Sequence, residues 1–101
     1  MNKQLIFNHA EFYAKHFGKE FTDLMVYMEK LFALESKIGQ FPIEYTRSCH
    51  PGIVYFCREC LGFKTEPEII GYTRFIVTEE SFKLLREVNI YLQLNTDFND
   101  L

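Results

Sequence analysis

The chain has 101 residues, of which 48% are apolar and 25% are charged, a composition typical of one ordinary globular domain. Its formal net charge is -3, and its Lys and Arg residues are scattered, which argues against nucleic-acid binding driven by charge alone. No apolar run approaches the roughly 20 residues of a membrane-spanning helix, so we expect no such helix.

The three cysteines and the N-terminal sequence indicate a reducing compartment. An odd cysteine count does not suit a secreted disulfide framework, and the first residues lack the apolar segment of a signal peptide. We therefore expect a cytoplasmic protein, in the host cytoplasm if the source is a virus. The chain is rich in Lys, Asn, Ile, Phe and Tyr and poor in Ala, Gly, Pro and Arg. AT-rich coding DNA produces this bias, which is frequent in phage and mobile-element genes.

Two helices are predicted in the first 39 residues. Asn2 is a suitable cap for a helix over residues 3–17, and Gly18 stands where a helix commonly ends. Thr22 is the predicted cap of a second helix that ends before Gly39. The short connection between them predicts antiparallel neighbours.

A β-hairpin is predicted over residues 43–57. Apolar and polar residues alternate from Ile43 to Cys49, and the apolar run Ile53–Cys57 follows. Between them, His50-Pro51-Gly52 has the chemistry of a turn, because proline fixes φ and glycine tolerates positive φ.

The remaining elements are a loop, a third strand and a last helix. Phe63–Glu68 is predicted to be a loop, and Ile69–Val77 is predicted to be a strand with a bulge or a close backbone approach at Gly71. Thr78 is the expected cap of the last helix, and residues 95–101 are expected to fray. The predicted fold is one α+β domain over residues 1–101, in the order ααβββα, with helices on one face of a three-stranded antiparallel sheet.

The spacing Cys57-x-x-Cys60 is that of half a zinc site. Other possible ligands are Cys49 and His50, which a regular hairpin keeps away from Cys57, and the histidines of the first helix, His9 and His16. We favour cysteines that simply pack in the core, and no bound metal or other cofactor. The alternative is a zinc-stabilised module that uses Cys57, Cys60, His9 and His16.

The sequence contains no catalytic signature. No helix is predicted to start at Cys57-x-x-Cys60, as a thioredoxin-like site requires. Cys49 and His50 are adjacent on a predicted strand and therefore point to opposite faces. We expect a protein that is not an enzyme, with no catalytic residues.

The tripeptide Tyr-Thr-Arg occurs on two predicted strands, at residues 45–47 and 72–74. If both copies face solvent, the tyrosines and arginines form one platform, and Tyr and Arg are enriched at interface hot spots. The alternative is that the tyrosines are half buried and the arginines pair with Glu44, Glu59 or Glu68. The residues predicted to bind a partner are Tyr45, Arg47, Arg58, Lys64, Tyr72 and Arg74.

The sequence therefore favours a small module that binds another protein through the exposed sheet face and the loop 63–68. A phage or mobile-element inhibitor or regulator of a host system is the narrower hypothesis. A single-stranded nucleic-acid-binding module is the alternative, because aromatic and guanidinium platforms also stack bases. A homodimer is compatible with either function.

Overall fold

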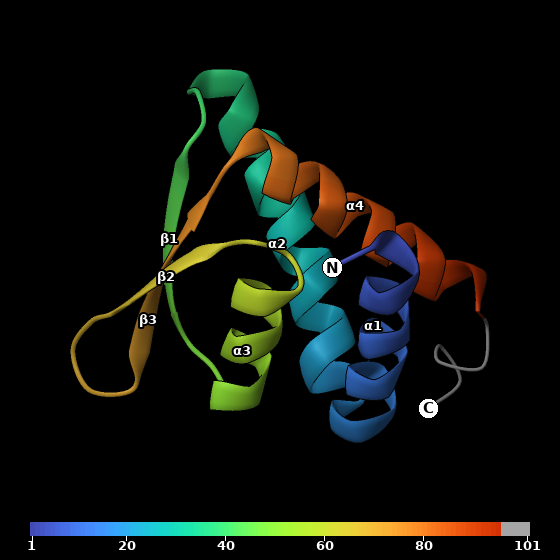
Figure 1. Ribbon diagram of the computed structural model, residues 1–101. Coiled ribbons are helices and arrows are strands. Elements are labelled where there is room, and N and C mark those ends of the chain that lie inside the picture. Colours follow the sequence, from blue (N-terminus) through green and yellow to red (C-terminus); the bar gives the residue numbers. More distant parts are fainter. Residues whose placement is uncertain (96–101) are drawn as a thin grey trace.

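The computed structural model describes residues 1–95 and confirms the α+β fold, with a three-stranded antiparallel sheet (Figure 1). The predicted frayed tail lies outside these residues from position 96 onward. The elements are α1 (Lys3–Phe17), α2 (Lys19–Ile38), β1 (Ile43–Ser48), α3 (Pro51–Glu59), β2 (Lys64–Pro67), β3 (Tyr72–Val77) and α4 (Glu79–Leu94). None of these helices is long and apolar enough to cross a bilayer.

The first two helices form as predicted, except at the start of the second. The side chain of Asn2 caps α1 by accepting a hydrogen bond from the Leu5 N–H. Gly18, with a φ of 60°, ends α1 and directly precedes α2, so the predicted cap at Thr22 is wrong. The Thr22 hydroxyl instead donates to the Gly18 carbonyl inside the first turn.

The predicted hairpin over residues 43–57 is wrong, because its second arm is the helix α3. Pro51 suits the first position of a helix, where its missing N–H has no intrahelical partner to lose. Ile53, Phe56 and Cys57 are all buried, and their spacing is that of one helix face. Tertiary burial of that face outweighs the β propensity of the run.

The strand missing from the hairpin is supplied by the predicted loop. Residues 64–67 form β2, which pairs antiparallel with β3, and the sheet order is β1-β3-β2. Pro67 lies at the end of this edge strand, where its missing N–H disturbs the sheet least. β3 begins at Tyr72, three residues later than predicted, because residues 69–71 belong to the turn before it.

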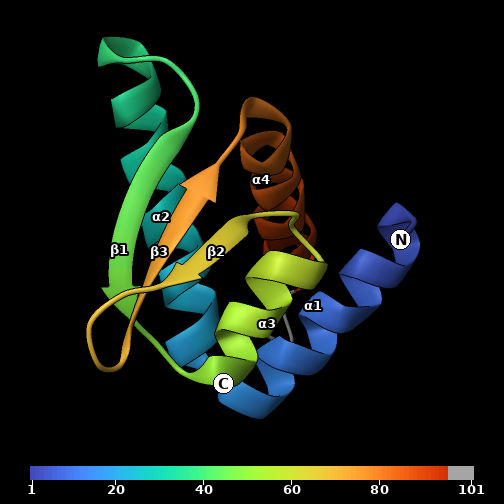
Figure 2. The ribbon, with the colours of Figure 1, turned by 60° about the vertical axis from the view of Figure 1, so that its left-hand side comes forward.

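The helices cover one face of the sheet, called the inner face here, and leave the outer face exposed (Figures 1 and 2). Phe75 and Val77 of β3 point into the core on the inner face, together with Ile43 of β1. Bulky aromatic side chains fill the space between sheet and helices. The fully buried ones are Phe21, Phe32, Phe56, Phe63 and Phe75.

One buried polar contact joins α4 to α2. The side-chain amide of Asn89 donates to the Met25 carbonyl at 3.0 Å and to Glu29 at 2.7 Å. Arg86 of α4 lies 3.5 Å from the same Glu29 carboxylate. The side of α2 that carries Glu29 therefore faces α4.

Candidate functional site

The outer face of the sheet collects three of the six predicted partner-binding residues. Arg74 and Tyr72 alternate with the buried Phe75 along β3, so they point away from the core. Lys64 of β2 lies opposite Ile76, which is on the same side of β3 as Arg74. Glu44 and Glu66 join them from the neighbouring strands.

Arg74 is held in an acidic cluster rather than presented freely to solvent. Its guanidinium lies 2.9 Å from Glu44, 3.7 Å from Glu68, and in a hydrogen-bonded ion pair with Glu66. The hydrogen bond to Glu66, followed by the charge of that carboxylate, raises the pKa of Arg74. Lys64 lies 3.9 Å from Glu66. The pairs with Glu44 and Glu68 belong to the alternative that the sequence left open, whereas Glu66 was not among its predicted partners. The cluster leaves the outer face with more carboxylates than cations.

Tyr45 and Arg47 lie on the other face of the sheet, so the predicted single platform does not form. β1 pairs with β3 so that Tyr45 lies opposite Phe75 and Arg47 lies opposite Thr73. Opposite residues share a face, which places this pair on the inner side, away from Arg74. In this register, Tyr45 and Arg47 lie opposite Phe75 and Thr73, each one residue away from Arg74 or Tyr72 along β3. Because neighbouring residues of a strand point to opposite faces, the two copies of the tripeptide present their Tyr and Arg side chains on different faces of the sheet.

Arg47 forms its own cluster beside α2. Its guanidinium donates to the Tyr45 hydroxyl at 2.9 Å and lies 5.6 Å from the ring centre of Tyr27. The hydrogen bond to Tyr45 raises the pKa of Arg47. Tyr45 is half buried against Phe32, whereas Arg47 is exposed at the margin of the sheet. This cluster is a separate surface from the acidic cluster.

Arg58 lies on neither of these surfaces. It belongs to α3, where it pairs with Glu59 at 3.1 Å and lies over the ring of Tyr55. The structure thus brings Lys64, Tyr72 and Arg74 together, pairs Tyr45 with Arg47, and leaves Arg58 apart.

The turn between β2 and β3 exposes two large apolar side chains that the sequence analysis assigned to a strand. Ile69 is 79% exposed and Ile70 is 98% exposed. The Tyr72 N–H donates to the Ile69 carbonyl at 2.9 Å, and Gly71 takes a φ of 81°, as the third residue of a type II turn does. We call Ile69 and Ile70, at this turn, the apolar tip.

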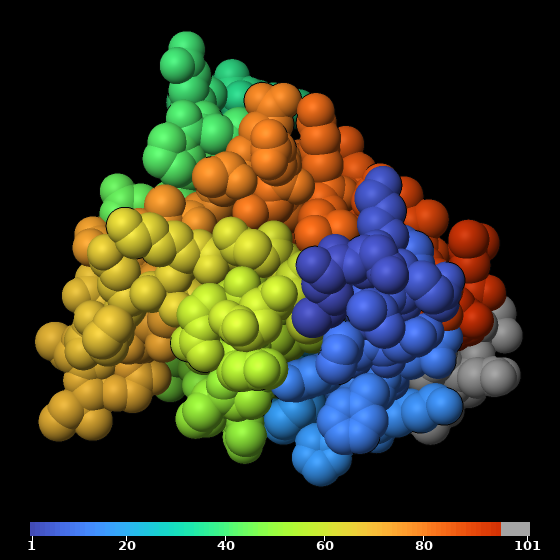
Figure 3. All heavy atoms as spheres, in the orientation of Figure 1, coloured from blue at the N-terminus to red at the C-terminus, as the bar shows by residue number. Residues whose placement is uncertain are grey.

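The apolar tip projects from the body of the molecule. The β2–β3 segment extends to one side in Figure 1 and forms a protrusion in Figure 3. Its base is held by the ion pairs of Arg74 and by the bond from the Glu68 N–H to the Tyr72 carbonyl. The sequence did contain a signal for it, because Pro67 and Gly71 bracket the two isoleucines and favour a turn there.

The four residues of the predicted zinc-stabilised alternative do not lie together. Cys57 and Cys60 are buried at the C-terminal end of α3, whereas His9 and His16 are exposed on α1. Burial, and then the neighbouring Cys49 and Cys60, raise the pKa of Cys57, which disfavours the thiolate that binds metal. Within residues 1–95, no group of three or more His, Cys, Asp or Glu residues could hold a metal ion.

The thiols also lack the surroundings of a reactive cysteine. Cys57-x-x-Cys60 ends a helix instead of starting one, so the helix dipole does not favour a thiolate there. His50 caps the other end of α3, where its Nδ1 accepts from the Gly52 N–H at 2.9 Å. That bond occupies the lone pair with which a neutral imidazole would take a proton from Cys49.

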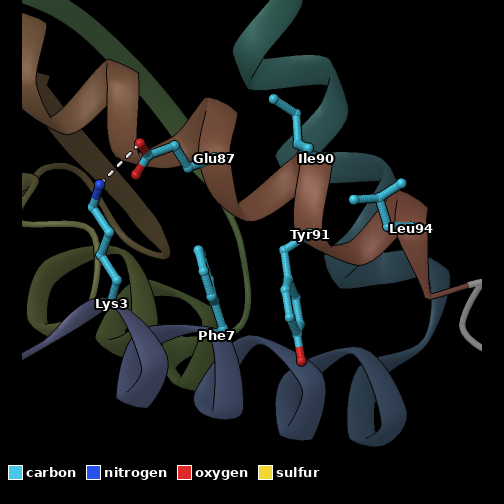
Figure 4. Close-up of a pocket in the computed structure, with 6 residues that line it drawn as sticks. All are labelled: Lys3, Phe7, Glu87, Ile90, Tyr91 and Leu94. Atoms are coloured by element: carbon cyan, nitrogen blue, oxygen red, sulfur yellow. Dashed lines mark hydrogen bonds and ion pairs between the residues drawn. The ribbon is translucent and has the colours of Figure 1, made fainter.

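The surface formed by residues 1–95 also has hollows. Figure 4 shows one between α1 and α4, where Phe7 and Tyr91 stack and Lys3 pairs with Glu87 across it. A hydrogen bond to Glu11 raises the pKa of Tyr91. The lining of this hollow is mostly apolar, and its single ion pair spans an exposed rim.

The geometry therefore presents two surfaces suited to contact with a partner: the apolar tip above the acidic cluster, and the Tyr27–Tyr45–Arg47 cluster. Comparison with protein-family models, with curated proteins and with solved structures finds no match to this chain.

Proposed function

We propose that this protein is a small protein-binding module that acts through the apolar tip and the outer face of its sheet. The exposure of Ile69 and Ile70 carries the proposal. Burying one isoleucine contributes roughly 1.5–3 kcal/mol, so insertion of both into a partner supplies a large part of a binding energy. A hydrogen-bonded turn limits the conformational entropy that binding costs.

The charges around the apolar tip define the chemistry of the partner. Glu44, Glu66 and Glu68 outnumber Arg74 and Lys64 on this face. A complementary partner has an apolar pocket whose rim carries Lys or Arg. The carboxylates also repel phosphate, and they occupy the guanidinium of Arg74, which supports a protein partner over single-stranded nucleic acid.

The proposal extends to the biological role. An amino-acid composition typical of AT-rich coding DNA supports a phage or mobile-element origin. A small module with a projecting apolar tip suits an inhibitor or regulator that fills a pocket on a host protein in the cytoplasm.

The test compares the double variant Ile69→Ser/Ile70→Ser with wild type as bait in a host-cell lysate. Ile90→Ser is the matched control, because Ile90 is 51% exposed on α4, away from the apolar tip. A protein retained by wild type and by the control, but lost from the double variant, supports the proposal. Once purified, that protein should bind the double variant at least about tenfold more weakly by calorimetry. Equal retention by all three baits overturns the proposal.

A further inference from the structure

The edge of β1 is open for pairing with another strand. Among residues 1–95, β1 pairs only with β3, and the pairing runs through six residues without a bulge. β1 contains no Pro and no Lys, and its charged residues are Glu44, which points to the outer face, and Arg47 near its end. The other edge strand, β2, has four residues, with Lys64 at one end and Pro67 at the other. Of the two edges, β1 is the one suited to strand addition.

A stripe of exposed apolar side chains on α2 lies beside this edge. Tyr27, Leu34 and Ile38 are 49%, 61% and 91% exposed, and their spacing of seven and four places them on one side of the helix. Tyr27 contacts the Tyr45 ring and Arg47, so the stripe starts next to β1. Glu29, about half a turn around the helix from the stripe, faces α4.

The chain connection aligns the stripe with the strand. α2 ends at Ile38 and β1 begins at Ile43, so only four residues connect them and the strand runs back along the helix. Ile38 is therefore near the start of β1, and Tyr27 lies near its end, at Arg47. An additional strand along β1 would have every second side chain directed toward the stripe.

Charged side chains of both signs border the same region. Arg47 is exposed at the end of β1 and, among residues 1–95, pairs with no carboxylate. On α2, the exposed charged residues next to the stripe in the helical projection are Lys30, Lys37, Asp23 and Glu35. Glu44, the acid of β1, points to the outer face and pairs with Arg74. The side on which an added strand would meet α2 is thus apolar, and, within the described residues, Arg47 places an unpaired positive charge at the end of β1.

We propose that the β1 edge and the α2 stripe bind an extended peptide segment of a protein partner by strand addition. The peptide alternates apolar side chains, which rest on Tyr27 and Leu34, with polar ones, and carries a carboxylate that pairs with Arg47. Main-chain hydrogen bonds to β1 supply affinity, and the alternate side chains supply specificity. This surface is distinct from the apolar tip, so the inference stands independently of the proposed function.

The test selects binders from a displayed library of random eight-residue peptides. Peptides with alternating apolar residues and an Asp or Glu at one end should be enriched. Bound to the protein, a selected peptide should slow hydrogen exchange at alternate amides of β1, because only every second N–H of an edge strand points outward. No enrichment, or protection elsewhere in the chain, overturns the inference.

Charge reversal provides the variant and its control. Arg47→Glu should lower the affinity for the acidic peptides at least about tenfold. The same variant should select peptides that carry Lys or Arg instead. Arg58→Glu is the matched control, because Arg58 is also exposed and also lies over a tyrosine ring, at 5.5 Å. It should leave peptide binding unchanged. Leu34→Glu, on the exposed stripe, should also reduce binding, and thermal melting checks that each variant is folded.

The remaining outcomes are equally decisive. The double variant of the apolar tip should bind the peptides as wild type does, which separates this inference from the proposed function. Equal binding of the peptides to the Arg47→Glu and Arg58→Glu variants overturns the inference. A dimer in which β1 amides are protected without peptide also overturns it, and would assign the edge to a second copy of the chain.

Discussion

At the scale of single residues, Arg74 is the residue whose role depends most on its neighbours. Three carboxylates surround its guanidinium, so its removal leaves like charges close together on adjacent strands. We predict that Arg74→Met lowers the melting temperature and that added salt reduces the difference, because salt screens the repulsion. Thermal unfolding at low and high ionic strength measures this effect.

Arg58→Met is the matched comparison for Arg74→Met. Arg58 has one carboxylate partner, Glu59, next to it in sequence. Its replacement should change the melting temperature less than Arg74→Met at low salt. Equal losses in the two variants would contradict the role given to the acidic cluster.

Cys57 makes the stability of the fold depend on pH in alkaline solution. Burial raises the pKa of Cys57 in the folded state, whereas an unfolded cysteine ionises near pH 8.5. Below about pH 8.5 the thiol is protonated in both states, so the free energy of unfolding does not depend on its ionisation. Above that pH only the unfolded chain gains the thiolate, so the free energy of unfolding falls as the pH rises. We predict a falling free energy of unfolding from about pH 8.5 upward in urea titrations.

Replacing the thiol tests its share of this dependence. Cys57→Ala removes the ionisable group, so its stability curve should be flatter than that of wild type over the same pH range. The variant is also less stable at neutral pH, because it leaves a small cavity in the core. The slope with pH, not the absolute stability, is therefore the quantity to compare. Parallel curves would show that Cys57 is not responsible.

At the scale of elements, α3 depends on its cap. The His50 side chain accepts a hydrogen bond from the Gly52 N–H, one of the N–H groups that a helix start leaves unpaired. We predict that His50→Ala lowers the free energy of unfolding by about 0.5–2 kcal/mol in urea. His50→Asp should recover most of the loss, since a carboxylate caps well and suits the positive end of the helix dipole. An Asp variant as unstable as the Ala variant would contradict the capping role.

The same element explains why the sequence predicted a hairpin. Pro51 and Gly52 suit a turn, and they also suit the start of a helix. The run from Ile53 to Cys57 is too short for periodicity to separate strand from helix. The buried residues of this segment are Ile53, Phe56, Cys57 and Cys60. Their spacings of three and four residues are helical, and this pattern becomes clear only when Cys60 is included.

At the scale of the whole molecule, the fold class was predictable and the composition of the sites was not. Helix caps and apolar periodicity specify the first two helices and the last helix locally. The apolar faces of these helices are buried by packing against the sheet. The face on which Tyr45 or Arg74 lies depends instead on the register between β1 and β3, which are 23 residues apart along the chain. No local pattern carries that register, so the predicted platform divided into two surfaces.

The whole molecule also separates residues needed for folding from residues available for binding. Ile53 is fully buried in the core, whereas Ile69 and Ile70 are almost fully solvated. We predict that Ile69→Ser/Ile70→Ser changes the free energy of unfolding by no more than about 0.5 kcal/mol, as surface substitutions usually do. Ile53→Ser should cost several kcal/mol, about 2–5 by analogy with large-to-small core changes. Urea unfolding of both variants compares the two positions. A loss above about 1 kcal/mol in the double variant would mean that the isoleucines contribute to folding, and their exposure would then no longer support a binding role.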